Sequence, residues 1–218
     1  MRQHNQMINA WLSEHIEQIK AGKIKVFVQD ECHLKGGDIC GYGWGNRQER
    51  LEIPVKNYRD SQTYYGAMNC LTGEMILRSY STANTKSTIE FVKELQSQNP
   101  ESKIALIWDG ASHHRCREFR DFLAQNNQGQ EWNVHCLRFA RQRVAGVPPV
   151  VATVEVAPYA PEENPIENVW GQLKQMLRSL CFLCRSFQLT KKLLEMLVKY
   201  QLFVLPDLNK YNALSSIT

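Results

Sequence analysis

The sequence lacks any long apolar run. Its uninterrupted hydrophobic stretches are short, such as residues 104–108 (IALIW), well below the roughly 18 residues that a membrane-spanning helix needs. The amino terminus is polar and amphipathic, without the compact apolar core or small-residue cleavage site of a secretory signal. These features predict a cytoplasmic protein.

The sequence also lacks a cysteine pattern typical of a disulfide framework. The seven cysteines are odd in number and scattered, which favours reduced thiols. Only Cys181 and Cys184 have the C-x-x-C spacing of a zinc site, and no second pair accompanies them, so structural zinc is the weaker alternative.

Low-complexity tracts and internal repeats are missing as well. With 12 glycines, 8 prolines and 43% hydrophobic residues, the composition excludes collagen-like, coiled-coil and disordered chains. A length of 218 residues predicts one globular domain with at most a short appendage.

Positive charge is concentrated near the carboxyl end. Residues 171–200 hold six Lys and Arg side chains and one Glu, a local charge of +5, whereas the whole chain carries +4. Such a segment is either a solvated helix face or a surface for a polyanion, and charge alone does not choose between them.

The hydrophobic pattern predicts an α/β fold, a mixed sheet in which three antiparallel strands are followed by a β-α-β unit, flanked by helices. β-branched and apolar runs predict the strands, and apolar residues at helical spacing predict the helices. The predicted strands are 23–30, 47–55, 63–70, 75–80, 103–108 and 133–139, and the predicted helices are 5–21, 86–98, 112–126, 164–180 and 186–203.

Three carboxylates lie where an α/β protein builds a site. Asp30 and Asp109 follow predicted strands, the first in an acidic pair with Glu31, and Glu167 lies in the first turn of a predicted helix. Clustered carboxylates repel one another unless they share a hard divalent cation, magnesium or manganese. Two such ions, about 3.5–4 Å apart, can catalyse an in-line phosphoryl displacement.

Each acid also has a local explanation that spacing alone leaves open. Asp109 is a possible helix-start residue and Asp30 a possible loop acid. The sequence Asn164-Pro165-Ile166-Glu167 fits a capping box, in which Glu167 reaches back to the backbone amide of Asn164.

Three segments resemble the catalytic core of DDE transposases of the mariner superfamily, specifically its bacterial insertion-sequence branch. In chain order they are FVQDE, ALIWDGASHH and PYAPEENPIENVWGQLK. The last is the most specific, because a strand-end Asp is common whereas Asn-Pro-Ile-Glu followed by Trp170 is rare by chance. The resemblance covers most of residues 23–182 and implies a ribonuclease H-like fold.

The resemblance also implies function. Asp30, Asp109 and Glu167 match the family's three metal-binding catalytic acids, which would hold two Mg²⁺ or Mn²⁺ ions for DNA strand cleavage and strand transfer in cut-and-paste transposition. The expected partners are DNA, as element ends and target, and a second copy of the chain, in a bacterial, nucleoid-associated setting. His114 matches a histidine of the second motif and is a candidate DNA contact; Lys174 and Arg178 are the best candidates for phosphate contacts.

Two departures from the family shape the predicted organisation. Complete relatives carry an amino-terminal helix-turn-helix region, whereas only about 22 residues precede the first catalytic strand here. We expect either that a separate chain supplies this region or that the chain is a truncated remnant. The apolar stretch 141–157 separates segments that relatives join directly. We predict a helix or linker over 1–22, a catalytic domain over 23–203 with an inserted loop at 141–157, and a tail over 204–218. An inactive transposase remnant, a DNA-binding protein and another ribonuclease H-like nuclease are the alternatives.

Overall fold

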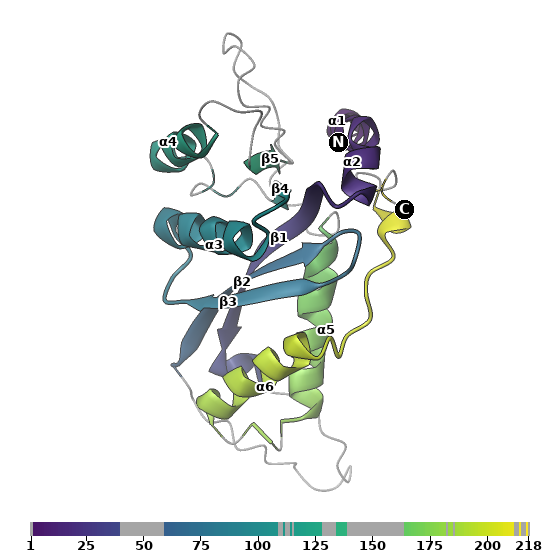
Figure 1. Cartoon of the computed structure of the whole chain (residues 1–218). Coiled ribbons are helices and arrows are strands. Elements are labelled where there is room, and N and C mark those ends of the chain that lie inside the picture. The colour runs from purple at the N-terminus through teal and green to yellow at the C-terminus, as the bar shows by residue number, and fades with distance from the viewer. Residues whose placement is uncertain are drawn as a thin grey trace, which may run out of the picture.

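A computed structural model describes most of the chain and shows a five-stranded mixed sheet (Figure 1). The described residues are 2–39, 59–108, 111, 114, 116–127, 134–138, 164–181, 183–184, 186–211, 214 and 217. The strand order is β3-β2-β1-β4-β5. The strands are β1 (Ile24–Lys35), β2 (Ser61–Asn69), β3 (Met75–Tyr80), β4 (Lys103–Trp108) and β5 (Val134–Arg138).

The pairing confirms the predicted fold class. β1, β2 and β3 are antiparallel neighbours, and β4 and β5 run parallel to β1. The connection from β2 to β3 is a tight turn, in which Gly73 has φ +72 and the side chain of Asn69 accepts from the backbone N–H groups of Leu71 and Thr72. β4 is buried along nearly its whole length, as its apolar sequence predicts for a central parallel strand.

Helices cover both faces of the sheet (Figure 1). α3 (Thr85–Gln98) and α4 (Arg117–Asn126) pack on one face, and their apolar residues share a core with Phe27 of β1. α1 (Arg2–Glu14), α2 (Ile16–Lys20), α5 (Pro165–Ser179) and α6 (Phe187–Lys199) contribute to the core of the other face. Two short 3₁₀ helices, η1 (Gly36–Ile39) and η4 (Leu208–Lys210), complete the described elements.

Several boundaries differ from the prediction. β1 continues to Lys35 instead of ending at the acidic pair, because β2 pairs with it as far as that residue. α4 begins at Arg117, later than the predicted Ser112, and is capped by Cys116. α6 ends at Lys199 because Gln201 adopts φ 49, and Leu202 N–H then donates to the carbonyl of Leu197 in a Schellman-type stop. The predicted strand 47–55 and the predicted insertion 141–157 lie outside the described residues.

Both ends of the chain pack into the hydrophobic core on the α5 face of the sheet. Ile8 and Leu12 of α1 are fully buried in the same cluster as Leu214 and Ile217, and Figure 1 shows the two termini close together. The division into 1–22, 23–203 and 204–218 stays a prediction. Within the part of the chain that the structure describes, no helix is long and apolar enough to cross a membrane.

Candidate active site at the carboxyl end of the parallel strands

The alternation of side chains along β1 decides which acid faces which helix layer. Val28 and Cys32 belong to the core under α5, whereas Phe27 belongs to the core under α3 and α4. Successive residues of a strand point to opposite faces. Asp30 therefore lies on the α5 face, where it is half-buried, and Glu31 lies on the α3 and α4 face.

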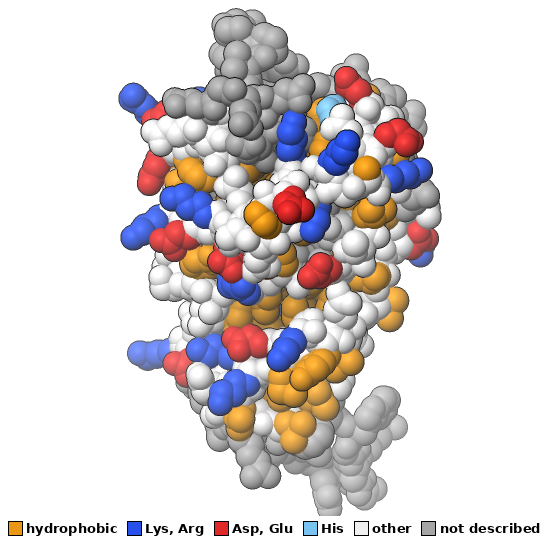
Figure 2. Space-filling view, in the orientation of Figure 1, with side chains coloured by type: hydrophobic (Ala, Val, Ile, Leu, Met, Phe, Trp, Pro, Cys, Tyr) orange, Lys and Arg blue, Asp and Glu red, His pale blue; other side chains and the backbone are white. Residues whose placement is uncertain are grey.

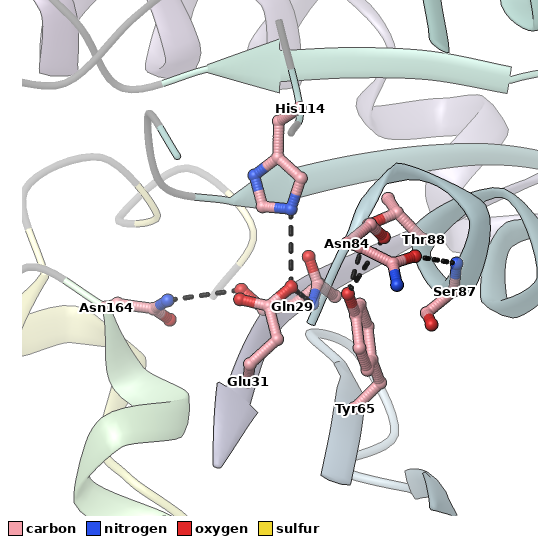
Figure 3. Close-up of polar contacts among 8 residues, drawn as sticks. All are labelled: Gln29, Glu31, Tyr65, Asn84, Ser87, Thr88, His114 and Asn164. Atoms are coloured by element: carbon pink, nitrogen blue, oxygen red, sulfur yellow. Dashed lines mark hydrogen bonds and ion pairs between the residues drawn. The ribbon is translucent and has the colours of Figure 1, made fainter. Parts of the chain in front are cut away.

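The start of α5 is fixed against β1 beside Asp30. The buried side chain of Asn164 caps the helix by accepting from Ile166 N–H at 3.3 Å. Its amide Nδ2 donates to the backbone carbonyl of Gln29 at 3.3 Å, as Figure 3 shows. Gln29 is the first β1 residue beyond Val28, the last one that pairs with β4. α5 thus begins where β4 has ended and next to the first acid.

Trp170 packs the next turn of α5 against the sheet, also beside Asp30. Gly66 of β2 is the direct cross-strand partner of Asp30. A Cβ atom at Gly66 would overlap the six-membered ring of Trp170, so the indole packs directly against this glycine. Glu167 lies one helical turn before Trp170 and its side chain is exposed. The structure therefore brings the α5 turn that carries Glu167 to the β1 and β2 pair that carries Asp30.

The third predicted acid, Asp109, lies outside the described residues. It follows Trp108, the last residue of β4, directly in the sequence. Among the described side chains alone, no group of three His, Cys, Asp or Glu residues is arranged to hold a metal. The two described acids nevertheless offer the carboxylate oxygens that Mg²⁺ and Mn²⁺ prefer, so the donor chemistry fits such an ion.

A buried polar network on the opposite face of β1 includes Glu31, which the sequence analysis did not select. Gln29 Nε2 donates to Glu31 Oε1 at 3.1 Å, and His114 Nε2 donates to the same oxygen at 3.3 Å (Figure 3). The side chains of His114 and Glu31 are 1% and 9% exposed. The sequence could have indicated the position of Glu31, because side chains alternate along a strand. If Asp30 faces one side of the sheet, the adjacent Glu31 faces the other side.

His114 is therefore not placed for the DNA contact that the sequence suggests. Its imidazole is buried and stacks flat on Trp108, with ring centroids 4.1 Å apart and an interplanar angle of 4°. A side chain enclosed in this way does not reach a phosphate group. Its contact with Glu31 instead fits a role in orienting an acid through a hydrogen bond.

Tyr65 lies beside this network on the neighbouring strand. It is the cross-strand partner of Glu31, and its hydroxyl donates to the carbonyl of Asn84 at 3.3 Å and contacts Thr88 Oγ1 at 3.2 Å. Burial raises the pKa of Tyr65 to about 12, and the charge of Glu31 contributes to the rise. Tyr65 is therefore a neutral hydrogen-bond donor at ordinary pH.

Basic side chains of α5 extend away from the acids along β1. Lys174 Nζ donates to the backbone carbonyl of His33 at 3.3 Å, three residues beyond Asp30. Arg178 is exposed in the last turn of the helix. α5 thus carries Glu167, Lys174 and Arg178 in that order along the second half of β1.

The chain matches the DDE superfamily endonuclease family over residues 25–187, a range that contains all three predicted acids. The chain belongs to this family. The predicted resemblance to DDE enzymes is thereby confirmed, while the bacterial insertion-sequence branch stays a prediction. A search of curated proteins finds no match to the chain.

Solved structures of a mariner transposase share the fold. The Mos1 transposase paired-end complex with the left transposon end matches 98% of this chain at 14% identity and a TM-score of 0.57. The Mos1 strand transfer complex matches 100% of this chain at 13% identity and a TM-score of 0.54. The Mos1 mariner paired-end complex with Mn matches 98% of this chain at 14% identity and a TM-score of 0.53. In each case the chain spans 58% of the length of the Mos1 chain.

Proposed function

We propose that this DDE superfamily chain is the catalytic domain of a transposase, a divalent-metal-dependent enzyme that cuts DNA and joins the freed ends to target DNA. One contact carries the proposal: Asn164 donates to the Gln29 carbonyl and thereby starts α5 beside Asp30. This places Glu167 on the first turn of a helix that faces the first acid. The family match over 25–187 and the Mos1 likeness in fold support it.

The three acids are the proposed catalytic and metal-binding residues. Asp30 is held in a paired strand, and Asp109 follows β4 directly in the sequence. β4 is in turn the parallel neighbour of β1 in the sheet. Glu167 approaches from α5. These residues would hold Mg²⁺ or Mn²⁺, and two such ions would stabilise the charges on the attacking and leaving oxygens of a phosphodiester.

In the proposed reaction water attacks a DNA phosphodiester and the bond from phosphorus to the 3′ oxygen breaks, which leaves a 5′-phosphate and a 3′-hydroxyl. This 3′-hydroxyl then attacks a phosphodiester of the target strand, forms a new bond to its phosphorus and displaces the target's own 3′ oxygen as a hydroxyl. The described residues would orient this chemistry through the contacts of β1 with α5. Asn164 and Trp170 are the positioning residues on the α5 side, because they fix the turn that carries Glu167 without themselves supplying a carboxylate.

DNA is the proposed partner, held by Lys174 and Arg178. The exposed face over β3 and α6 mixes positive and negative side chains (Figure 2), which does not suit a long polyanion. Lys174 and Arg178 instead continue along α5 from Glu167. A homodimer, a separate chain with a helix-turn-helix domain, and a bacterial, nucleoid-associated location complete the proposal.

Nicking of supercoiled plasmid in Mn²⁺ or Mg²⁺ tests the proposed function. The wild-type chain is expected to convert supercoiled DNA to open circles only with the metal, and Asp109→Asn is expected to lower the rate at least a hundredfold. Circular dichroism of both chains checks that the fold is retained. A folded wild-type chain that binds DNA but never nicks it would favour the inactive remnant, and deletion of 141–157 would then show whether that segment silences the site.

Replacing Lys174 and Arg178 together with Ala tests the DNA contacts. Each phosphate contact adds close to one unit to the slope of log affinity against log salt, so the double variant should lower the slope by about two. Fluorescence anisotropy with labelled duplex DNA at several salt concentrations measures it. The matched control is Lys86→Ala with Lys93→Ala on α3, which should keep the wild-type slope; an unchanged slope in the α5 variant would remove these residues from the interface.

A further inference from the structure

The contact between Glu31 and His114 is a buried polar pair that the proposed metal site does not use. The two residues are 83 positions apart in the sequence, and their side chains are almost entirely enclosed. A carboxylate away from water is costly unless it is hydrogen-bonded or paired. Loss of His114 would therefore leave the buried Glu31 carboxylate without one of its hydrogen bonds.

His114 connects two strands at the point where their pairing ends. β1 and β4 pair as far as Val28 and Ile107. Beyond that point the imidazole of His114 stacks on Trp108, the last residue of β4, and its Nε2 donates to Glu31 of β1. His114 also closes a short turn, since its N–H donates to the carbonyl of Ala111 at 3.1 Å. Asp109 lies in the sequence between the held residues Trp108 and His114.

Glu31 is in turn fixed by its neighbours on the sheet. Gln29 Nε2 donates to the same carboxylate oxygen that His114 contacts, and Tyr65 lies directly across on β2. Asp30 lies between Gln29 and Glu31 in the sequence but on the opposite face of the strand. The network thus holds the backbone on both sides of Asp30 without touching the face on which a metal would bind.

We infer that the Glu31 and His114 pair is a positioning device that holds the carboxyl end of β4 in place relative to Asp30, and so sets the affinity of the acids for divalent cations. This inference rests on the proposed function. Neither residue is a catalytic residue, because both lie on the face of the sheet opposite to Asp30. The pair acts only through the strands it joins.

The test compares Mn²⁺ binding and nicking in four variants of the full chain. Glu31→Ala and His114→Ala remove the hydrogen bond, and Glu31→Gln keeps an acceptor oxygen but removes the charge. Glu195→Gln is the control, since Glu195 accepts from Tyr64 on the other side of the sheet and touches no part of the network. Calorimetry without DNA gives the Mn²⁺ affinity, and thermal unfolding in EDTA gives the stability without metal.

The expected result is a loss of Mn²⁺ affinity on the order of tenfold in Glu31→Ala and His114→Ala, as for residues that support metal ligands. The Mn²⁺ concentration for half-maximal nicking should rise by the same factor. Glu31→Gln should recover most of the affinity, and Glu195→Gln should match the wild type. If Glu31→Ala does not fold, His114→Ala and Glu31→Gln make the same comparison.

Two results would overturn the inference. Wild-type Mn²⁺ affinity in all the variants, with only a lower unfolding temperature, would show a purely structural role. A Glu31→Gln variant as weak as Glu31→Ala would show that the charge of Glu31 acts directly. A wild-type chain that neither binds Mn²⁺ nor nicks DNA would instead contradict the proposed function itself.

Discussion

At the residue scale, two adjacent acids have different tasks because they lie on different faces of one strand. Asp30 faces α5 and the candidate metal site, whereas Glu31 is buried against His114. The sequence shows both acids and the histidine. It does not show the contact between Glu31 and His114, because that contact depends on how β1 and β4 pair. The resemblance therefore suggested a DNA contact for His114, and nothing in the sequence indicated its contact with Glu31.

Substitutions of Glu167 and Asn164 distinguish a catalytic role from a helix-capping role. Glu167→Gln should abolish nicking and change the free energy of unfolding little, because its side chain is exposed. Asn164→Ala should lower that free energy by about 1–2 kcal/mol, because it removes the cap and the hydrogen bond to Gln29. Urea denaturation and plasmid nicking of both variants measure the two effects. A Glu167→Gln variant that loses stability but keeps its activity would support the capping box instead.

At the element scale, α5 connects sequence motif and site most directly. The pattern from Asn164 to Trp170 predicts the helix, its cap and its first acid, and the structure confirms the helix and the cap. The packing role of Trp170 was not predictable, because its packing surface is Gly66, which lies more than a hundred residues earlier in the sequence. Only the folded sheet brings a glycine opposite Asp30 under this indole.

Gly66→Ala tests that packing. The added methyl group would overlap Trp170 and the end of Met75, so we expect a loss of about 1–3 kcal/mol in the free energy of unfolding and slower nicking as α5 shifts. Chemical denaturation and plasmid nicking measure these changes. The matched control is Gly171→Ala, within α5 and with open space at its Cβ position, which should gain about 0.5–1 kcal/mol. Equal stability of the two variants would contradict the account of Trp170.

At the scale of the whole molecule, the order of strands and helices was predictable and the ends of elements were not. Apolar runs predict the strands and apolar periodicity predicts the helices, because their apolar side chains form the cores on the two faces of the sheet. The extension of β1 to Lys35 was missed because the polar residues after Asp30 resemble a loop. In the structure they pair with β2, and Glu31 is accommodated by a hydrogen bond from His114.

We propose that three acids, distant in sequence, together hold the divalent metal ions. Ferrous iron, which carboxylates also bind, replaces Mg²⁺ in such sites and with ascorbate and peroxide cuts the nearby backbone. We expect cuts close to residues 30, 109 and 167 in the wild-type chain, suppressed by excess Mg²⁺ and absent in Asp109→Asn. Cuts confined to one of these segments, or the same pattern in Asp109→Asn, would contradict the account.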